Sequence, residues 1–210
     1  MKQKQTTISQ SGFTVIELLV VFVIMVTVFV VVLVGFNRQR ITRSTVIAQN
    51  EMVTNLRKIQ SYMLSSRNIG TTGKAASFYI MRFQSGSGQY TVQAVGQESD
   101  GSYTFYDNLE TIRINDTVTV SGLSLTNRGG TTSTPSCVQI IFAAPFGKVY
   151  IDTVDSSCGS NIVNTLRDPG VLATKADAKL TITLRHSQGA STAITKTIDI
   201  FGLSGRVVGN

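Results

Sequence analysis

An uninterrupted apolar stretch dominates the N-terminal third of the chain. Between Glu17 and Arg38 lie 20 residues without one charged side chain. At ~1.5 Å per residue, a helix of that length crosses a hydrocarbon layer ~30 Å thick. Many of these residues are valines, which suit buried strands, but the stretch is far too long for a strand. Because lipid leaves a lone segment no other way to satisfy its backbone hydrogen bonds, the stretch predicts a membrane-spanning helix.

Two simpler interpretations of this segment are a secretory signal peptide and a generic membrane anchor. The apolar run exceeds the ~7–15 residues of a signal peptide's apolar region, no A-x-A-like cleavage site follows it, and helical periodicity continues beyond it. A generic anchor does not explain Glu17, because a carboxylate inside an apolar segment costs ~2.5–3.5 kcal/mol on insertion. Glu17 therefore needs a partner.

A processing motif stands at the start of the apolar stretch. Residues 12–20, Gly-Phe-Thr-Val-Ile-Glu-Leu-Leu-Val, follow a polar segment, residues 1–12, that holds two lysines and no acidic side chain. The motif closely resembles the prepilin processing motif of type IV pilins and of type II secretion and competence pseudopilins. The resemblance implies that a membrane aspartic protease, the prepilin peptidase, cleaves between Gly12 and Phe13, and that Phe13 is then N-methylated. It also implies that Glu17 serves subunit assembly by pairing with the N-terminal ammonium of an adjoining subunit, and a buried carboxylate is tolerable only when paired.

The expected orientation comes from this resemblance and not from the charges. Two lysines before the span and Arg38, Arg40 and Arg43 after it leave the positive-inside rule about neutral. The family implies a single-pass inner-membrane protein with its leader in the cytoplasm and its head outside, later assembled into a periplasmic or cell-surface filament. The implied partners are other pilin or pseudopilin subunits, the prepilin peptidase and an inner-membrane assembly platform.

The helical pattern continues beyond the apolar stretch. A mainly apolar stripe recurs at steps of three and four, at Ile41, Thr45, Ala48, Met52, Leu56, Ile59 and Met63. Gly70 and Gly73, in a Ser/Thr-rich patch, mark its end. The sequence therefore predicts a leader at 1–12, one helix over 13–67 with about 13–37 in the membrane, and a head over 68–210.

Strand-like runs alternate with turn residues through the head. The predicted strands are Phe78–Phe83, Gln89–Val95, Tyr103–Tyr106, Thr117–Leu125, Cys137–Phe142, Lys148–Thr153, Lys179–Arg185 and Ala193–Phe201. The Gly/Ser/Thr-rich segment Asn127–Ser136 predicts a mobile loop. A long helix packed on one or two antiparallel sheets is an α+β fold, and the resemblance implies that it is the pilin fold.

Two segments of the head resemble GspH/FimT-type minor pseudopilins. Residues 140–147, Ile-Ile-Phe-Ala-Ala-Pro-Phe-Gly, look like the F-x-P-x-G hairpin of that group with one extra residue before the proline. Residues 198–207 look like its closing strand, which ends in Gly-Arg, here Gly205-Arg206. FimT-type members that bind DNA carry a second arginine two residues later, where this chain has Val208. Arg206 alone remains as a candidate nucleic-acid contact.

The two cysteines, Cys137 and Cys158, are expected to form a disulfide if the head is exported, and to be free thiols if it is cytosolic. A hairpin turning at Pro145-Phe146 places Cys137 opposite residue 154, four residues before Cys158. The single histidine, His186, ends a predicted strand beside a turn and is expected at the surface.

No enzyme motif is present in the sequence: it has no P-loop, G-x-S-x-G, HExxH or dinucleotide-binding glycine pattern. Asp152 and Asp155 lie at a strand end and do not indicate an acid–base pair, and we expect no cofactor and no metal. The net charge of +7, or +5 without the two leader lysines, permits contact with nucleic acid or acidic membrane and establishes neither. The leading hypothesis is a minor pilin or pseudopilin that helps initiate or decorate a filament. The alternatives are a major pilin and a filament-borne module that captures DNA or a surface.

Overall fold

The computed structural model describes residues 14–65, 75–106, 110–144, 148–154, 158, 178–187, 194–202 and 204–210. These residues form one long helix and eleven strands, and every strand pairing is antiparallel, so the fold class is α+β as predicted. The chain divides into two compact units, residues 1–40 and 41–210. The first unit contains the apolar part of the helix, and the second contains the rest of the helix with all the strands.

Helix α1 runs from Val15 to Leu64 and contributes to both units. No proline interrupts it, and Gly35 is its one glycine. Within the second unit one face of α1 is buried, at Thr45, Ala48, Gln49, Met52, Leu56, Ile59 and Met63. This is the predicted stripe, except that Ile41 is half-buried and Gln49 is added. Phe13, Gly70 and Gly73 lie outside the described residues.

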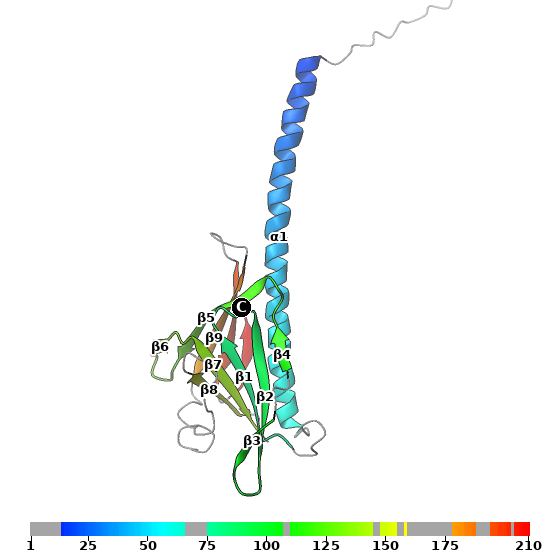
Figure 1. Ribbon diagram of the computed structural model, residues 1–210. Helices are drawn as coiled ribbons and strands as arrows, with labels where there is room; N and C mark the ends of the chain where they lie inside the picture. Colours follow the sequence, from blue (N-terminus) through cyan, green and yellow to red (C-terminus); the bar gives the residue numbers. More distant parts are fainter. Residues whose placement is uncertain are drawn as a thin grey trace, which may run out of the picture. The chain divides into compact units, whose positions relative to one another are not determined.

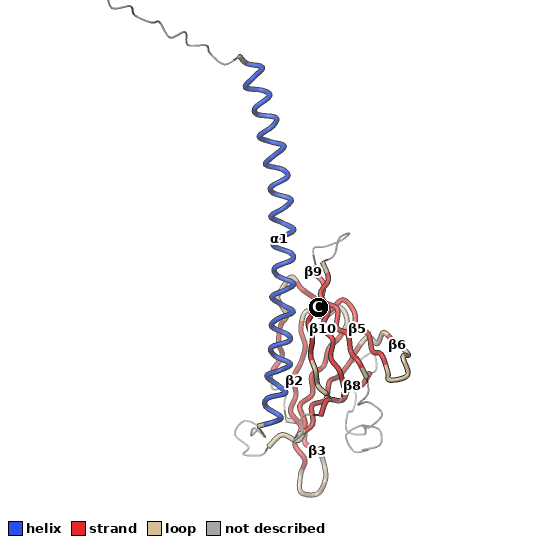
Figure 2. The backbone as a smooth tube through the Cα atoms, turned by 180° about the vertical axis from the view of Figure 1, so that it is seen from behind, coloured by secondary structure: helices blue, strands red, loops and turns tan. Residues whose placement is uncertain are grey.

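The strands form two sheets (Figures 1 and 2). The first has the order β3 (Tyr103–Phe105), β2 (Gln89–Gln97), β1 (Phe78–Gln84), β7 (Cys137–Ala143) and β8 (Lys148–Val154), with β4 (Glu110–Arg113) also paired to β2. The second has the order β11 (Val207–Gly209), β10 (Thr195–Phe201), β9 (Lys179–His186), β5 (Val118–Thr126) and β6 (Thr132–Ser133).

The main core contains side chains from both sheets and from the second half of α1. Alternate residues of β9 and β1, such as Ile182 and Met81, belong to one buried cluster with Leu56 of the helix, and all three are fully buried. Alternation of this kind is the pattern of strands that bury one face. A smaller cluster around Ile80 and Ile141 occupies the opposite face of the first sheet.

Side-chain hydrogen bonds fix α1 to both sheets of the head. Asn55 Nδ2 donates to the Tyr90 hydroxyl in β2 at 2.8 Å. Gln49 Nε2 donates to the carbonyl oxygens of Thr197 in β10, at 2.8 Å, and of Asn210, at 2.9 Å. Residues 41–64 of the helix therefore bridge a strand of the first sheet and the C-terminal end of the second.

The predicted strands are found with small shifts, and three short ones were missed. β4, β6 and β11 have two to four residues each, too few to show a periodic pattern. β6 lies inside the segment predicted as a mobile loop, where it pairs with the end of β5. In the β7–β8 hairpin, Cys137 lies opposite Val154, which is the predicted register.

The expectation of a surface His186 was wrong. β9 extends one residue further than predicted, and His186 pairs with Val118 of β5. Its side chain is 5% exposed. The physical reason is parity: His186 lies on the same side of β9 as Leu184, which is fully buried, while Arg185 between them is exposed.

The turn before β11 brings the chain close to α1. Gly205 has a φ of +60°, in the left-handed region, and its carbonyl oxygen accepts a 2.5 Å hydrogen bond from Gln60 Nε2. A Cβ added at Gly205 would press on the same nitrogen and would lie 2.9 Å from Cγ2 of Val149 in β8. Both the backbone conformation and the surroundings therefore require glycine.

Gly205→Ala is expected to lower the free energy of unfolding by about 2 kcal/mol, of which about 1 comes from the left-handed backbone and about 1 from crowding. Gly130→Ala is the matched control, because Gly130 has a φ of +80° and nothing within 4 Å of an added Cβ. Its free energy of unfolding should fall only by the backbone contribution, about 1 kcal/mol. Urea unfolding of the detergent-solubilised full chain measures both variants, and equal losses would contradict the close contact at Gly205.

Asp199 joins β9, β10 and the C-terminal residue, and it is 8% exposed. Its oxygens accept from Thr181 Oγ1 at 2.7 Å, Lys179 Nζ at 2.9 Å and Asn210 Nδ2 at 3.2 Å. Burial raises the pKa of this carboxyl, but the donors from Thr181, Lys179 and Asn210 together outweigh it and hold the pKa below its ordinary value of 3.8.

A carboxyl whose pKa is lower in the folded state stabilises the fold fully above its unfolded pKa, and that stability is lost as pH falls through the folded pKa. Stability from Asp199 should therefore be complete above about pH 4 and decline below it. Asp199→Asn is expected to reduce stability at neutral pH and to flatten the decline between about pH 4 and pH 2. Thermal unfolding across that range is the measurement, and an unchanged pH profile in the variant would contradict the assignment.

Candidate functional site: an apolar helix with one carboxylate

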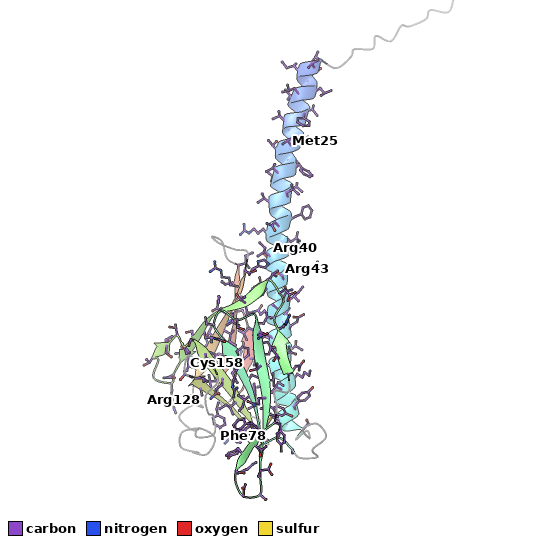
Figure 3. All side chains as sticks on the ribbon, viewed as in Figure 1. Met25, Arg40, Arg43, Phe78, Arg128 and Cys158 are labelled. Atoms are coloured by element: carbon purple, nitrogen blue, oxygen red, sulfur yellow. A yellow bond between two sulfur atoms is a disulfide. The ribbon has the colours of Figure 1, made fainter. Side chains whose placement is uncertain are left out.

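Among the described residues, nothing covers the first half of α1. Each large apolar side chain from Val15 to Phe36 is at least 44% exposed, and Figure 3 shows side chains standing out all round this segment, with Met25 labelled. Exposure of so many apolar side chains to water is strongly unfavourable, at about 1.5–3 kcal/mol for each large one. By length and composition this helix is able to cross a membrane. The segment therefore requires an apolar environment, either lipid or other helices.

Glu17 lies in the first turn of this helix and closes it as a capping box. Its carboxylate oxygen Oε2 accepts hydrogen bonds from the Thr14 amide nitrogen and the Thr14 hydroxyl, both at 2.9 Å. In return, the Glu17 amide nitrogen donates to Thr14 Oγ1 at 3.3 Å. These bonds satisfy amide groups that a helix start leaves unpaired, and the carboxylate complements the positive end of the helix dipole. The two bonds that the carboxylate accepts both go to Oε2, so the other carboxylate oxygen takes no part in the cap.

The predicted cleavage site, Gly12 and Phe13, lies outside the described residues, and its processing stays a prediction. The two cysteines are joined: Cys137, fully buried in β7, forms a disulfide with Cys158, and their Cα atoms are 5.6 Å apart. Cys158 is the one described residue between 155 and 177 and is labelled in Figure 3. The bond ties the start of β7 to the chain that follows β8.

Arg206 is exposed in the turn between β10 and β11. The turn is closed by the Phe201 amide nitrogen, which donates to the Arg206 carbonyl oxygen at 3.0 Å. An open depression of about 540 Å³ includes Phe201 in its lining, with Arg128 and Lys179 as its basic residues. The ammonium of Lys179 is already paired with Asp199. A contact of Arg206 with nucleic acid stays a prediction.

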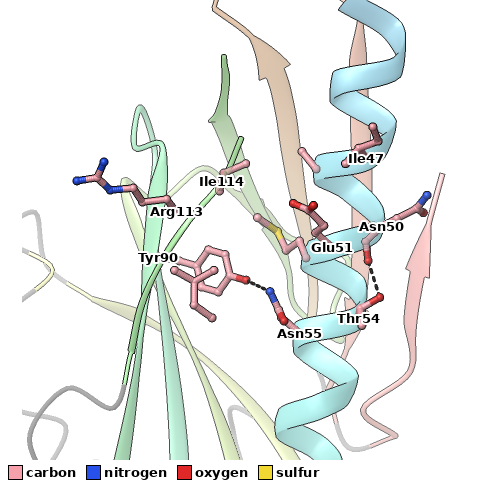
Figure 4. A pocket seen from close by; sticks show the side chains of 11 residues that line it. Ile47, Asn50, Glu51, Thr54, Asn55, Tyr90, Arg113 and Ile114 are labelled. Carbon is pink, nitrogen blue, oxygen red and sulfur yellow. Dashed lines mark hydrogen bonds between the residues drawn. The ribbon is translucent and has the colours of Figure 1, made fainter. Parts of the chain in front are cut away.

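A second hollow, of about 360 Å³, lies between α1 and β4 (Figure 4). It is lined by Ile47, Ala48, Asn50, Glu51, Met52, Thr54 and Asn55 of α1, by Tyr90 of β2, and by Ile112, Arg113 and Ile114. Figure 4 shows Glu51 on α1 and Arg113 across from it, with the Arg113 side chain extending away from α1. Burial raises the pKa of Tyr90 to about 12, so its hydroxyl is neutral and accepts the Asn55 bond. The lining offers shape and apolar contact, with neither His nor Cys among its residues.

Asp155 lies outside the described residues, so only the surroundings of Asp152 are described. Asp152 is 6% exposed in β8, and Gln139 Nε2 of β7 approaches its carboxylate at 3.4 Å. Arg82 of β1 lies opposite Gln139 and donates from Nη2 to Gln93 at 3.1 Å. Among the described side chains, no three of His, Cys, Asp or Glu converge as a metal site requires.

Sequence reasoning found Glu17 but missed its bonding to Thr14. The signal was available, since Thr-x-x-Glu before an apolar run is the pattern of a capping box. Comparison with protein-family models, curated proteins and solved structures finds no match for this chain.

Proposed function

We propose that this chain is a pilin-like subunit, of the minor pilin or pseudopilin kind, in a filament anchored in the inner membrane. One observation carries the proposal: α1 begins with a lone carboxylate, Glu17, and continues as an apolar helix that nothing in the described structure covers. An anchor needs the apolar surface and a helix cap, but an uncharged glutamine at this position would supply the cap without a charge in the apolar layer. A helix that moves from lipid into a bundle of similar helices uses both the apolar surface and the carboxylate.

In the membrane, the capping box gives Glu17 a local partner while the subunit is alone. Thr14 supplies two donors to the carboxylate, so the group enters the apolar layer already bonded. Hydrogen bonds from neutral donors leave the negative charge itself uncompensated. In a filament, the N-terminal ammonium of an adjoining subunit supplies the opposite charge. Assembly is then favoured because it covers the apolar helix and neutralises a carboxylate that lipid cannot solvate.

The head fits a subunit that must stay folded outside the cytoplasm. A disulfide joins Cys137 and Cys158, and disulfides persist where the environment is oxidising. The α+β architecture, with the second half of α1 fixed to both sheets, suits a pilin fold in which the helix carries the head into the filament. The proposal includes cleavage after Gly12 by a prepilin peptidase, methylation of Phe13, and contact with an inner-membrane assembly platform.

The proposed function is tested by measuring whether the leader is cleaved from the chain in the membrane fraction. The chain, produced in its own host and in a strain lacking the prepilin peptidase, is purified and its intact mass measured. We expect loss of residues 1–12 and one added methyl group in the host, and the full chain in the other strain. Gly12→Val should retain the leader in both, because a branched side chain blocks close access of a protease to the backbone. The same full-length mass in both strains would contradict the proposal.

A further inference from the structure

The apolar part of α1 has two chemically different faces. At ~100° per residue, all three phenylalanines between Val15 and Phe36, together with Met25 and the three leucines, fall within an arc of about 120°. Only Val15 and Val26 share that arc. We call it the aromatic face. The other thirteen positions hold Glu17, Gly35 and eleven β-branched residues, and we call them the β-branched face.

The positions of Glu17 and Gly35 indicate that the β-branched face contacts protein. Glu17 lies on it, and ionisable residues within a membrane span almost always face other protein or water and not lipid. Gly35, the one glycine of the helix, lies on the same line as Glu17, 18 residues and about five turns further along. Glycine at a helix surface lets another helix approach closely. The ionisable residue and the one glycine of this helix therefore occupy one face.

Side-chain entropy favours the same division. A valine or isoleucine in a helix has one strongly preferred χ1 rotamer, so packing against a second helix restricts it little. Leucine and methionine lose more rotamer freedom when they are fixed in one packing arrangement, methionine most of all. Fluid lipid leaves that freedom in place. Because association of helices in lipid depends on close van der Waals packing and not on a hydrophobic effect, the stiff face is the better packing surface.

We propose that the β-branched face is the surface on which α1 packs against an adjoining subunit, and that the aromatic face is turned to lipid. The partner it fits is another apolar membrane helix that carries a cation for Glu17. This inference rests on the proposed function, since it takes the adjoining subunit from it. It adds the orientation of the helix, which neither the processing motif nor the apolar composition specifies.

Photo-crosslinking in intact membranes of the host tests the orientation. A diazirine-bearing residue replaces either Val31, on the β-branched face, or Phe29, on the aromatic face. The two positions are about 160° apart around the helix and only ~3 Å apart in depth, so they form a matched pair. After illumination, mass spectrometry identifies what is attached. We expect another filament subunit at position 31 and lipid at position 29.

An exchange of side chains gives a second readout. Val31→Phe should reduce recovery of the chain in isolated filaments about tenfold, because a large side chain overfills the packed face. Phe29→Val should change recovery less than about twofold, because the aromatic face is not the surface on which α1 packs against the adjoining subunit. Membrane levels of both variants should match the wild type, since both side chains favour insertion.

Three results would overturn the orientation while leaving the filament function intact: subunit adducts at position 29 and lipid adducts at 31, equal adducts at both, or lipid at both with the chain still in filaments. If the wild-type chain is absent from isolated filaments, the proposed function fails and the inference fails with it. Filament recovery therefore separates the two failures.

Discussion

Glu17→Ala is expected to insert into the membrane at wild-type levels or better, yet to be nearly absent from filaments. The change removes an insertion penalty of ~2.5–3.5 kcal/mol. In a filament it leaves the neighbour's ammonium unpaired in an apolar core, and breaking a buried ion pair costs about 3–5 kcal/mol. Incorporation should fall about a hundredfold or more. The measurement compares the chain's abundance in the membrane fraction and in sheared filaments.

The matched control for this variant is Glu51→Ala. Glu51 is an exposed glutamate of the same helix, beyond the apolar segment and beside the hollow between α1 and β4. Its substitution should leave incorporation within about twofold of the wild type, because an exposed charge contributes little. Equal incorporation of Glu17→Ala and Glu51→Ala would remove the assembly role from Glu17. A parallel drop in membrane level and filament level would indicate a folding defect instead.

Cys158→Ala is expected to destabilise the head by about 3 kcal/mol, because the disulfide closes a loop between residues 21 positions apart. For a chain of this size that corresponds to a fall in Tm of about 10 °C. Thermal unfolding of the full chain in detergent measures the effect. Cys158 is replaced, not Cys137, because Cys137 is fully buried in β7 and its loss would also leave a cavity.

Reduction of the wild-type chain provides the internal control. Dithiothreitol should lower the Tm of the wild type to that of Cys158→Ala and should leave the variant unchanged. If the oxidised and the reduced wild-type chain unfold at the same temperature, the disulfide does not stabilise the head. Detection of two free thiols by peptide mapping without reductant would exclude the disulfide altogether.

Periodic patterns in the sequence predicted the helix and most of the strands. Met52, Leu56 and Ile59 are spaced at four and three, and the structure buries all three on one face of α1. The β7–β8 register followed from the position of the turn, because pairing in a hairpin is set by where the chain reverses. Local spacing determines these features, so a sequence is sufficient to reveal them.

Features that depend on partners distant in the sequence were not predictable in this way. Gln49 and Gln60 look like solvent-facing residues of an amphipathic helix. Gln49 nevertheless donates to carbonyl oxygens of Thr197 in β10 and of Asn210, 148 and 161 positions later. Gln60 donates to that of Gly205, in the turn before β11, 145 positions later. β4, β6 and β11 exist because neighbouring strands supply their hydrogen bonds. His186 could have been placed, since its parity with Leu184 already set its side of β9.

The candidate site was predictable only in part. Spacing and an apolar surround identified Glu17, and the Thr-x-x-Glu pattern contains its capping partner. Filament assembly depends on contacts between several chains, and local patterns within one sequence do not predict such contacts. The two faces of the helix are readable from the sequence once the helix is known to run without a break from Val15.

The most direct test of the proposed function is the mass of the chain recovered from filaments. Filaments sheared or extracted from the host are purified away from membranes, and the chain in them is measured by intact mass spectrometry. The proposal predicts a chain that begins at Phe13, carries one added methyl group and retains the Cys137–Cys158 disulfide. Recovery of the chain only from membranes, with Met1 to Gly12 still attached, would contradict it.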